Sequence, residues 1–214
     1  MEGRIIKALA GYYYVFDNEE RIWSCRARGV FKKQGIQPLV GDVVQFEQVS
    51  NQDGWITNIS PRKNSLQRPP IANIDQALLV HAVTEPSFNP LLLDRMLVVV
   101  EHIGIVPLLC FTKADLLEDW QWIKQQFNIY QELGYQMVLT SAVSGLGIDK
   151  LRRALEGKIT VLAGPSGAGK STLLNKICPH VTLETGAVSK KLGRGKHTTR
   201  HVELLKLSPS GLVA

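Results

Sequence analysis

The hydrophobic and polar positions follow two different rhythms along the chain. Up to about residue 60 the apolar residues form short runs separated by turn residues, and residues 21–28 alternate polar with apolar side chains as a half-buried strand does. Asn51-Gln52-Asp53-Gly54 predicts a hairpin turn. We expect five strands, over residues 4–9, 12–16, 21–28, 43–47 and 55–59. Five short strands in this length predict a small all-β barrel, for which an OB-fold is the best match.

From residue 74 the pattern changes to strands that alternate with helices. The strands, expected over residues 76–83, 106–111, 137–139 and 159–163, are continuously apolar, as in a parallel sheet that is covered on both faces. Asn89-Pro90 predicts a capped helix that closes near Gly104. Further helices are expected over residues 117–133, 149–155 and 171–177, and paired strands over 202–207 and 211–214. This part is therefore predicted to be an α/β domain.

Residues 60–73 are basic and rich in proline, which predicts a connector between the two parts. We accordingly expect an OB-fold domain over residues 1–68 and an α/β domain over residues 69–214.

The strongest chemical signal is a phosphate-binding loop. The residues Gly164-Pro165-Ser166-Gly167-Ala168-Gly169-Lys170-Ser171 match the pattern G-x-x-x-x-G-K-[ST] at every fixed position, between a predicted strand and a predicted helix. Glycines let backbone N–H groups surround an anion, Lys170 can reach the β- and γ-phosphates, and the Ser171 hydroxyl can ligate Mg²⁺. Thr172 completes the expected contact set. A glycine-rich turn that binds nothing is the alternative, and the register with both flanking elements argues against it.

Two further loops indicate guanine as the base. Thr112-Lys113-Ala114-Asp115 follows a predicted strand and resembles N-K-x-D, in which the carboxylate accepts from guanine N–H groups and the lysine stem lies along the base. Threonine in place of asparagine is expected to remove an amide that braces the loops. After the next strand comes Thr140-Ser141-Ala142, where the backbone N–H of Ala142 can donate to guanine O6. Either short pattern alone recurs by chance, but both lie where parallel sheets bind nucleotides.

The order of these loops is unusual, because the base-reading loops precede the phosphate loop. In ordinary GTPases the phosphate loop comes first, so the order predicts a circularly permuted GTPase domain. Residues 189–200 are basic and rich in glycine, which predicts either a mobile loop or a switch whose threonine closes on Mg²⁺ and the γ-phosphate. We favour Thr199 over Thr198 for that role.

The overall charge and composition change this picture only modestly. The net charge of +6 favours an anionic partner, and Arg26, Arg28, Lys32 and Lys33, with Tyr12, Tyr14 and Trp23 nearby, are candidates for contacting RNA. The alternative is that these aromatic residues belong to the core and these charges to an ordinary solvated face. No run of apolar residues reaches membrane-spanning length and the three cysteines are scattered, so we expect a cytoplasmic protein with reduced thiols and no membrane partner.

The permuted order, the OB-like barrel, the Arg-Pro connector and the Gly-Arg-Gly-Lys-His-Thr-Thr loop together resemble the RsgA (YjeQ/YloQ) family of bacterial GTPases that depend on the small ribosomal subunit. The resemblance covers essentially the whole chain. It implies a monomer that binds the 30S subunit and its 16S rRNA, uses GTP, GDP and Mg²⁺, hydrolyses GTP with stimulation by the subunit, and acts late in subunit maturation. It also suggests His197 as the residue that positions the attacking water in place of the usual glutamine, the alternative being a solvent-exposed histidine of a mobile loop.

The family continues beyond the position of Ala214 into a D-T-P-G segment and a C-terminal zinc-binding domain. On this resemblance we expect the chain to be a shortened form that binds guanine nucleotide weakly and hydrolyses GTP poorly. The sequence leaves two alternatives open. One is an RNA-binding module with a nucleotide switch and no useful turnover, and the other is a P-loop ATPase of different function, against which Asp115 argues.

Overall fold

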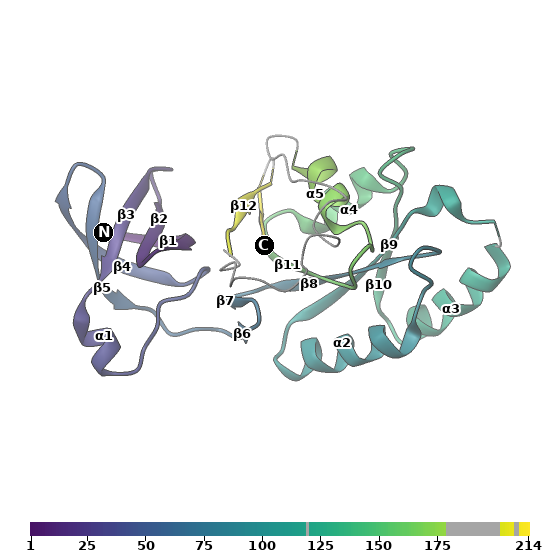
Figure 1. Ribbon diagram of the computed structural model, residues 1–214, viewed down its shortest axis with the longest axis horizontal. Coiled ribbons are helices and arrows are strands. Elements are labelled where there is room, and N and C mark those ends of the chain that lie inside the picture. Colours follow the sequence, from purple (N-terminus) through teal and green to yellow (C-terminus); the bar gives the residue numbers. More distant parts are fainter. Residues whose placement is uncertain (119, 179–201, 208–209) are drawn as a thin grey trace, which may run out of the picture. The chain divides into compact units, whose positions relative to one another are not determined.

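The computed structural model describes residues 1–118, 120–178, 202–207 and 210–214, which form two compact units (Figure 1). Residues 1–74 and 202–205 belong to the first unit. The second unit begins at Asp75 and includes the described residues 206–207 and 210–213.

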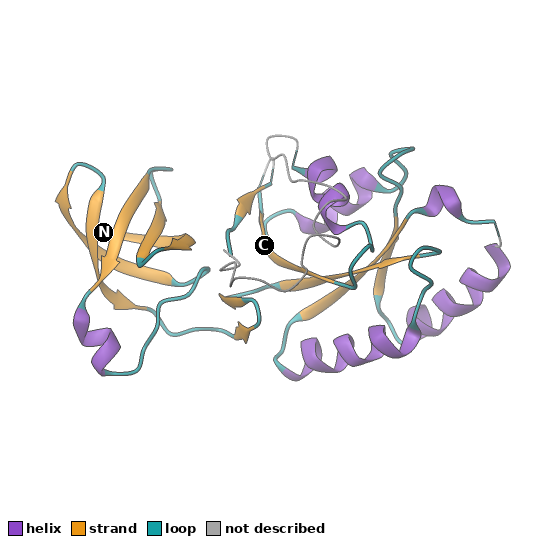
Figure 2. Cartoon of the chain, in the orientation of Figure 1, coloured by secondary structure: helices purple, strands orange, loops and turns teal. Residues whose placement is uncertain are grey.

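The first unit is built around a closed barrel of five strands in the order β1-β2-β3-β5-β4. Every neighbouring pair is antiparallel except β3 with β5, which run in parallel (Figure 2). The strands are β1 (Glu2–Leu9), β2 (Tyr12–Asp17), β3 (Ile22–Ala27), β4 (Val43–Ser50) and β5 (Asp53–Ile59). This arrangement confirms the OB-like barrel that the alternating pattern predicts.

The period of two along the strands determines the barrel's core. Val15, Cys25 and Ile56 are fully buried, whereas their neighbours along the strands are more exposed. A short helix, α1 (Gly29–Lys33), separates β3 from β4 and was not predicted. Its five residues are too few to show a helical period, so the sequence carried no signal for it.

The expected connector is a folded part of the first unit. Strands β6 (Ser65–Gln67) and β7 (Pro70–Ala72) form a hairpin, and Ile71 and Ile74 are fully buried. The guanidinium of Arg62 forms an ion pair with the buried Asp42 (2.7 Å) and donates to the Gln37 carbonyl (2.6 Å). The first compact unit runs to Ile74. The functional boundary between the two domains, expected after residue 68, stays a prediction.

The second unit contains the sheet β10-β9-β8-β11-β13-β12. The pairs from β10 to β13 are parallel, and β8 is buried along its whole length, as a strand covered on both faces must be. The strands are β8 (Gln76–Ala82), β9 (Val106–Thr112), β10 (Gln136–Leu139), β11 (Ile159–Ala163), β12 (Leu205–Lys206) and β13 (Leu212–Val213).

Helices cover both faces of this sheet, with α2 and α3 on one side and α4 and α5 on the other (Figure 1). The helices are α2 (Pro90–His102), α3 (Trp120–Glu132), α4 (Ile148–Leu155) and α5 (Lys170–Ile177), and a single 3-10 turn, η1 (Ala114–Leu116), precedes α3. The predicted cap of α2 is present, because Asn89 Oδ1 accepts from the Leu92 N–H (3.1 Å). Helix α3 begins at Trp120 rather than at the predicted residue 117, where the backbone is still extended after η1.

No helix in the described part of the chain is long and apolar enough to span a membrane.

Candidate nucleotide site and barrel surface

The phosphate loop leaves the carboxyl end of β11 and enters α5, as predicted. A Cβ on Gly164 would lie 2.1 Å from the carbonyl oxygen of Val80 in β8, so only glycine fits there. Gly167 and Gly169 have φ angles of +80° and +85°, which side chains rarely adopt. The loop is therefore a backbone cradle of the kind that holds phosphate oxygens at a helix N-terminus.

Lys170 spans this cradle. Its amino group donates to the carbonyls of Gly164 (2.9 Å) and Pro165 (2.8 Å), and burial lowers its pKa. A bound phosphate would offer this cation a charged partner and would offset the cost of its partial burial. Of the remaining predicted loop residues, Ala168 is fully buried and Ser166 is exposed. Ser171 is half-buried and Thr172 exposed in the first turn of α5.

Thr112 joins the base-reading loop to the phosphate loop. Its hydroxyl donates to the Ala168 carbonyl at 2.6 Å, and Thr112 itself is buried at the end of β9. The amide of the usual asparagine is absent, as expected, but the threonine hydroxyl makes its own direct bond to the phosphate loop. Asparagine has a longer reach, but β8 and β9 bring the two loops close enough for the shorter side chain.

The base-reading residues are also held in place. Ser141 donates its hydroxyl to Asp115 Oδ1 and accepts from the backbone N–H groups of Val143 (3.2 Å) and Ser144 (3.1 Å). Lys113 adopts a left-handed backbone (φ +61°) and donates its amino group to the Glu85 carbonyl. The Asp115 carboxylate is exposed, so its orientation is fixed while it stays open to a ligand. Ala142, the expected O6 donor, lies half-buried beside Ser141.

His81 and Thr84, at and just after the end of β8, each carry a buried polar side-chain atom. His81 in β8 is 2% exposed, and the described residues offer no hydrogen-bond partner to its Nε2 or to the Thr84 hydroxyl. Burial and the nearby charge of Lys170 lower the pKa of His81 to about 4, so the ring is neutral near pH 7. A histidine within an apolar strand is typical of an ordinary core or surface position, and nothing in the local sequence indicates proximity to Lys170.

The predicted switch residues His197, Thr198 and Thr199 lie outside the described residues. Among the residues that are described, no group of three or more His, Cys, Asp or Glu side chains gathers as a metal site.

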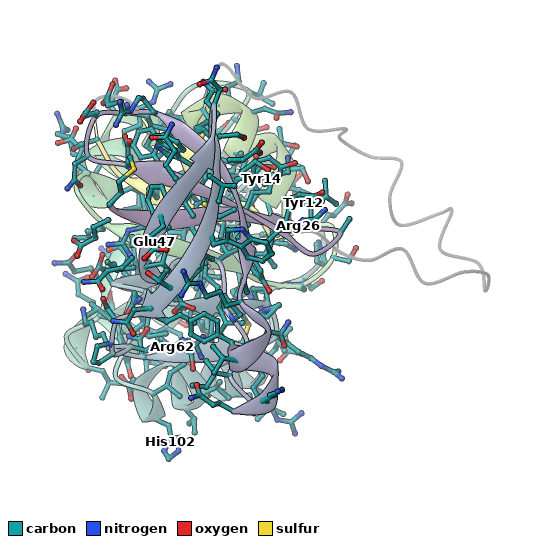
Figure 3. All side chains as sticks on the ribbon, turned by 90° about the vertical axis from the view of Figure 1, so that its left-hand side faces the viewer. Tyr12, Tyr14, Arg26, Glu47, Arg62 and His102 are labelled. Atoms are coloured by element: carbon teal, nitrogen blue, oxygen red, sulfur yellow. The ribbon has the colours of Figure 1, made fainter. Side chains whose placement is uncertain are left out.

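On the barrel, Arg26 lies within an aromatic surface. Its guanidinium carbon is 4.5 Å from the ring centroid of Tyr12, and it also donates to the Tyr12 hydroxyl. Tyr14 projects from β2, the strand that also carries Tyr12 (Figure 3). Trp55, which pairs with Arg26 across β3 and β5, is 38% exposed. We call Tyr12, Tyr14, Arg26 and Trp55 the aromatic–arginine face. Trp55 was not predicted as part of this surface. It faces outward because side chains alternate along a strand and its neighbour Ile56 is buried.

One of the barrel candidates needs correction. Trp23 is 4% exposed and donates its indole N–H to the buried Asp17 (2.7 Å), because the strand alternation places it inside together with Cys25. Arg28 is exposed but forms an ion pair with Glu47 (2.6 Å). Lys33 is exposed at the end of α1, and the side chain of Lys32 lies outside the described part.

Comparison with known proteins agrees with this architecture. The RsgA N-terminal domain model matches residues 2–56, and the RsgA GTPase model matches residues 59–214. Proteins described as small ribosomal subunit biogenesis GTPase RsgA are 53% identical in Halalkalibacterium halodurans and 51% identical in Geobacillus sp. (strain WCH70). Both alignments cover all of this chain, and 72% and 73% of the respective relatives.

Two solved structures share the fold. YjeQ from Thermotoga maritima superposes with a TM-score of 0.83 at 32% identity, over 99% of this chain and 72% of that one. YloQ, described as a circularly permuted GTPase, has a TM-score of 0.80 at 41% identity, over 99% of this chain and 69% of that one. The permuted loop order is thereby confirmed, and the chain belongs to the RsgA GTPase family.

Proposed function

We propose that residues 112–115, 141–142 and 164–171 form one site that binds GTP and hydrolyses it to GDP and phosphate. The observation that carries this assignment is the pair of side-chain bonds that connects the three loops, from Thr112 to Ala168 and from Ser141 to Asp115. Family membership supplies GTP as the nucleotide. Asp115 accepts from guanine, the Ala142 N–H donates to O6, and the stem of Lys113 lies along the base.

The phosphate end of this site follows from the cradle geometry. Loop N–H groups and Lys170 neutralise the phosphates and stabilise the negative charge that develops during phosphoryl transfer. Bound Mg²⁺ would add further charge neutralisation, and its fit rests on the Ser171 hydroxyl, which lies in the first turn of the helix behind the cradle. Thr199 is proposed as the second ligand, with Thr198 as the alternative, and His197 as the group that orients water.

We further propose that the barrel brings the chain to the small ribosomal subunit through 16S rRNA. The relatives are described as small ribosomal subunit biogenesis GTPases, which supplies the subunit, and the aromatic–arginine face supplies a surface suited to single-stranded RNA. Such surfaces combine base stacking on aromatic rings with cations for the phosphates. Subunit biogenesis implies action in the cytoplasm, and we propose that the chain acts there as a monomer.

The test is GTP turnover measured with and without purified 30S subunits, alongside the affinity of the chain for the subunit. The proposal expects binding of both ligands and faster hydrolysis when the subunit is present. Arg26→Glu should weaken subunit binding without changing affinity for GDP, because Arg26 belongs to the barrel. Binding of GTP without any subunit-dependent turnover would instead support the nucleotide-switched RNA-binding module.

A further inference from the structure

The barrel carries two adjoining pockets that none of the assignments above uses. Their volumes are about 320 Å³ and about 460 Å³, within the range of small-ligand sites. Gly11, Tyr13, Gln37 and Pro38 line both, so the pockets meet at the tip of the β1–β2 hairpin and the segment before β4. Ala8 and Val202 border the first pocket, and the Leu204 N–H bond to Ile6 (2.7 Å) keeps the segment that carries Val202 beside β1.

The wall of these pockets is fixed rather than loose. Arg62 donates to the Gln37 carbonyl and to both oxygens of the buried Asp42. Asp42 in turn accepts from the Leu39 N–H at 2.7 Å, which holds the segment on both sides of Pro38. A pocket bounded by a segment with this many bonds does not have to be assembled when a ligand arrives, which lowers the entropic cost of binding.

The surroundings of the pockets favour a particular class of ligand. The residues that line them are mainly apolar and include Tyr13, while Arg28, which is also paired with Glu47 (2.6 Å), and Arg26, which stacks on Tyr12, lie close by. Arg28 borders the second pocket, and Tyr12, which carries the stacked Arg26 guanidinium, borders the first. Tyr12 thus belongs both to the aromatic–arginine face and to the first pocket, so a single strand of nucleic acid can contact the two.

We propose that these pockets receive one unpaired nucleobase of a single-stranded RNA that crosses the aromatic–arginine face. The base stacks against Tyr13 inside, while its phosphates stay outside near Arg26 and Arg28. Splayed bases held by aromatic side chains are the usual basis of specific RNA recognition. This inference rests on the proposed function, because it assigns a base-binding site to a barrel that is proposed to bind RNA.

The experiment compares RNA binding by three forms of the full chain. Ala8→Leu fills the first pocket from its border, and Gln48→Leu adds the same side chain at an exposed position of β4 that lines neither pocket. The probe is a short, unstructured oligouridine, with an abasic oligomer of equal charge as its partner. Ala8→Leu should weaken oligouridine binding about tenfold, the loss expected for one stacked base, and should leave abasic binding and the salt dependence unchanged. Gln48→Leu should change neither.

A second measurement does not depend on the folding of any variant. Oligomers that contain 4-thiouridine are photo-crosslinked to the unaltered chain, and the modified peptide is mapped. The proposal expects crosslinks at Tyr13 or Pro38. Normal RNA binding with crosslinks confined to Tyr12, Tyr14 and Trp55 would overturn the pocket assignment but not the RNA-binding function. An apolar side chain of a protein partner would then be the occupant that fits the pockets. Absence of any RNA binding by the unaltered chain would overturn both this inference and the RNA part of the proposed function.

Discussion

The nucleotide site and the aromatic–arginine face hold their working residues in different ways. In the nucleotide site the side chains that would touch ligand are bonded to one another or to loop backbone, as with Asp115 to Ser141 and Thr112 to Ala168. On the barrel the working residues lie on the outside, where Arg26 bonds only to Tyr12 among the described residues, and the buried carboxylates Asp17 and Asp42 hold the charged networks that support the unit. Preorganisation is therefore built into the site itself in one unit and into its support in the other.

The largest effect is expected where the support of the barrel is broken. Arg62→Ala leaves the fully buried Asp42 without its cation, which should lower the free energy of unfolding of the barrel by roughly 3–5 kcal/mol. Chemical denaturation followed by tryptophan fluorescence measures this change, with the exposed Arg68→Ala as the control. A loss below about 1 kcal/mol would show that the ion pair does not support the pocket wall.

In the nucleotide site, Gly164→Ala should reduce affinity for GDP by about a hundredfold. A methyl group would meet the Val80 carbonyl at 2.1 Å and push the phosphate loop away from β8. Fluorescent-nucleotide titration measures the affinity. Gly29→Ala, where a Cβ meets nothing within 4 Å, serves as the matched substitution. Normal GDP binding by Gly164→Ala would mean that the cradle tolerates displacement and is not preorganised as described.

The buried His81 should make the stability of the second unit sensitive to acid. Because the pKa of His81 falls to about 4 in the folded state, the unfolded chain binds more protons between about pH 6.5 and pH 4. The second unit should therefore lose roughly 1–3 kcal/mol of stability as the pH falls through that window. His81→Leu should remove this pH dependence, which denaturation at pH 7 and pH 5 would reveal. An unchanged pH dependence in His81→Leu would assign the effect to other groups.

A smaller effect is expected at the brace between the loops. Thr112→Val keeps the shape but removes the donor to Ala168, so the affinity for GDP should fall about tenfold, while Thr112→Ser should retain most of it. Isothermal titration with GDP distinguishes the two variants. Equal affinities would show that the hydroxyl makes no contribution to holding the phosphate loop.

Most of the nucleotide site could be predicted from the sequence because its motifs are local. The phosphate loop needs a fixed order of neighbouring residues, and the strands that carry the three loops are long apolar runs. The brace from Thr112 to Ala168 could not be predicted in this way, because it depends on how β8, β9 and β11 align residues distant in the chain. The same limit applies to His81 and Lys170.

The barrel shows where composition misleads. Strand alternation predicted its five strands, and the same alternation assigns Trp23 to the core and Trp55 to the surface. Proline and basic residues in 60–73 suggested a connector, but Asp42 recruits Arg62, and Ile71 and Ile74 fill the core. Amino-acid composition does not show which residue a charged side chain will pair with, nor whether an isolated isoleucine will be buried.

The central claim, that the three loops form one guanine-specific site, is tested most directly by the nucleotide preference of Asp115→Asn. The amide would donate where the carboxylate accepts, which suits xanthine rather than guanine. The account predicts that affinity for GDP falls by about a hundredfold while affinity for XDP rises, with Asp149→Asn on α4 unchanged as the control. If Asp115→Asn kept its preference for GDP over XDP, Asp115 would not contact the base, and the site as described would be wrong.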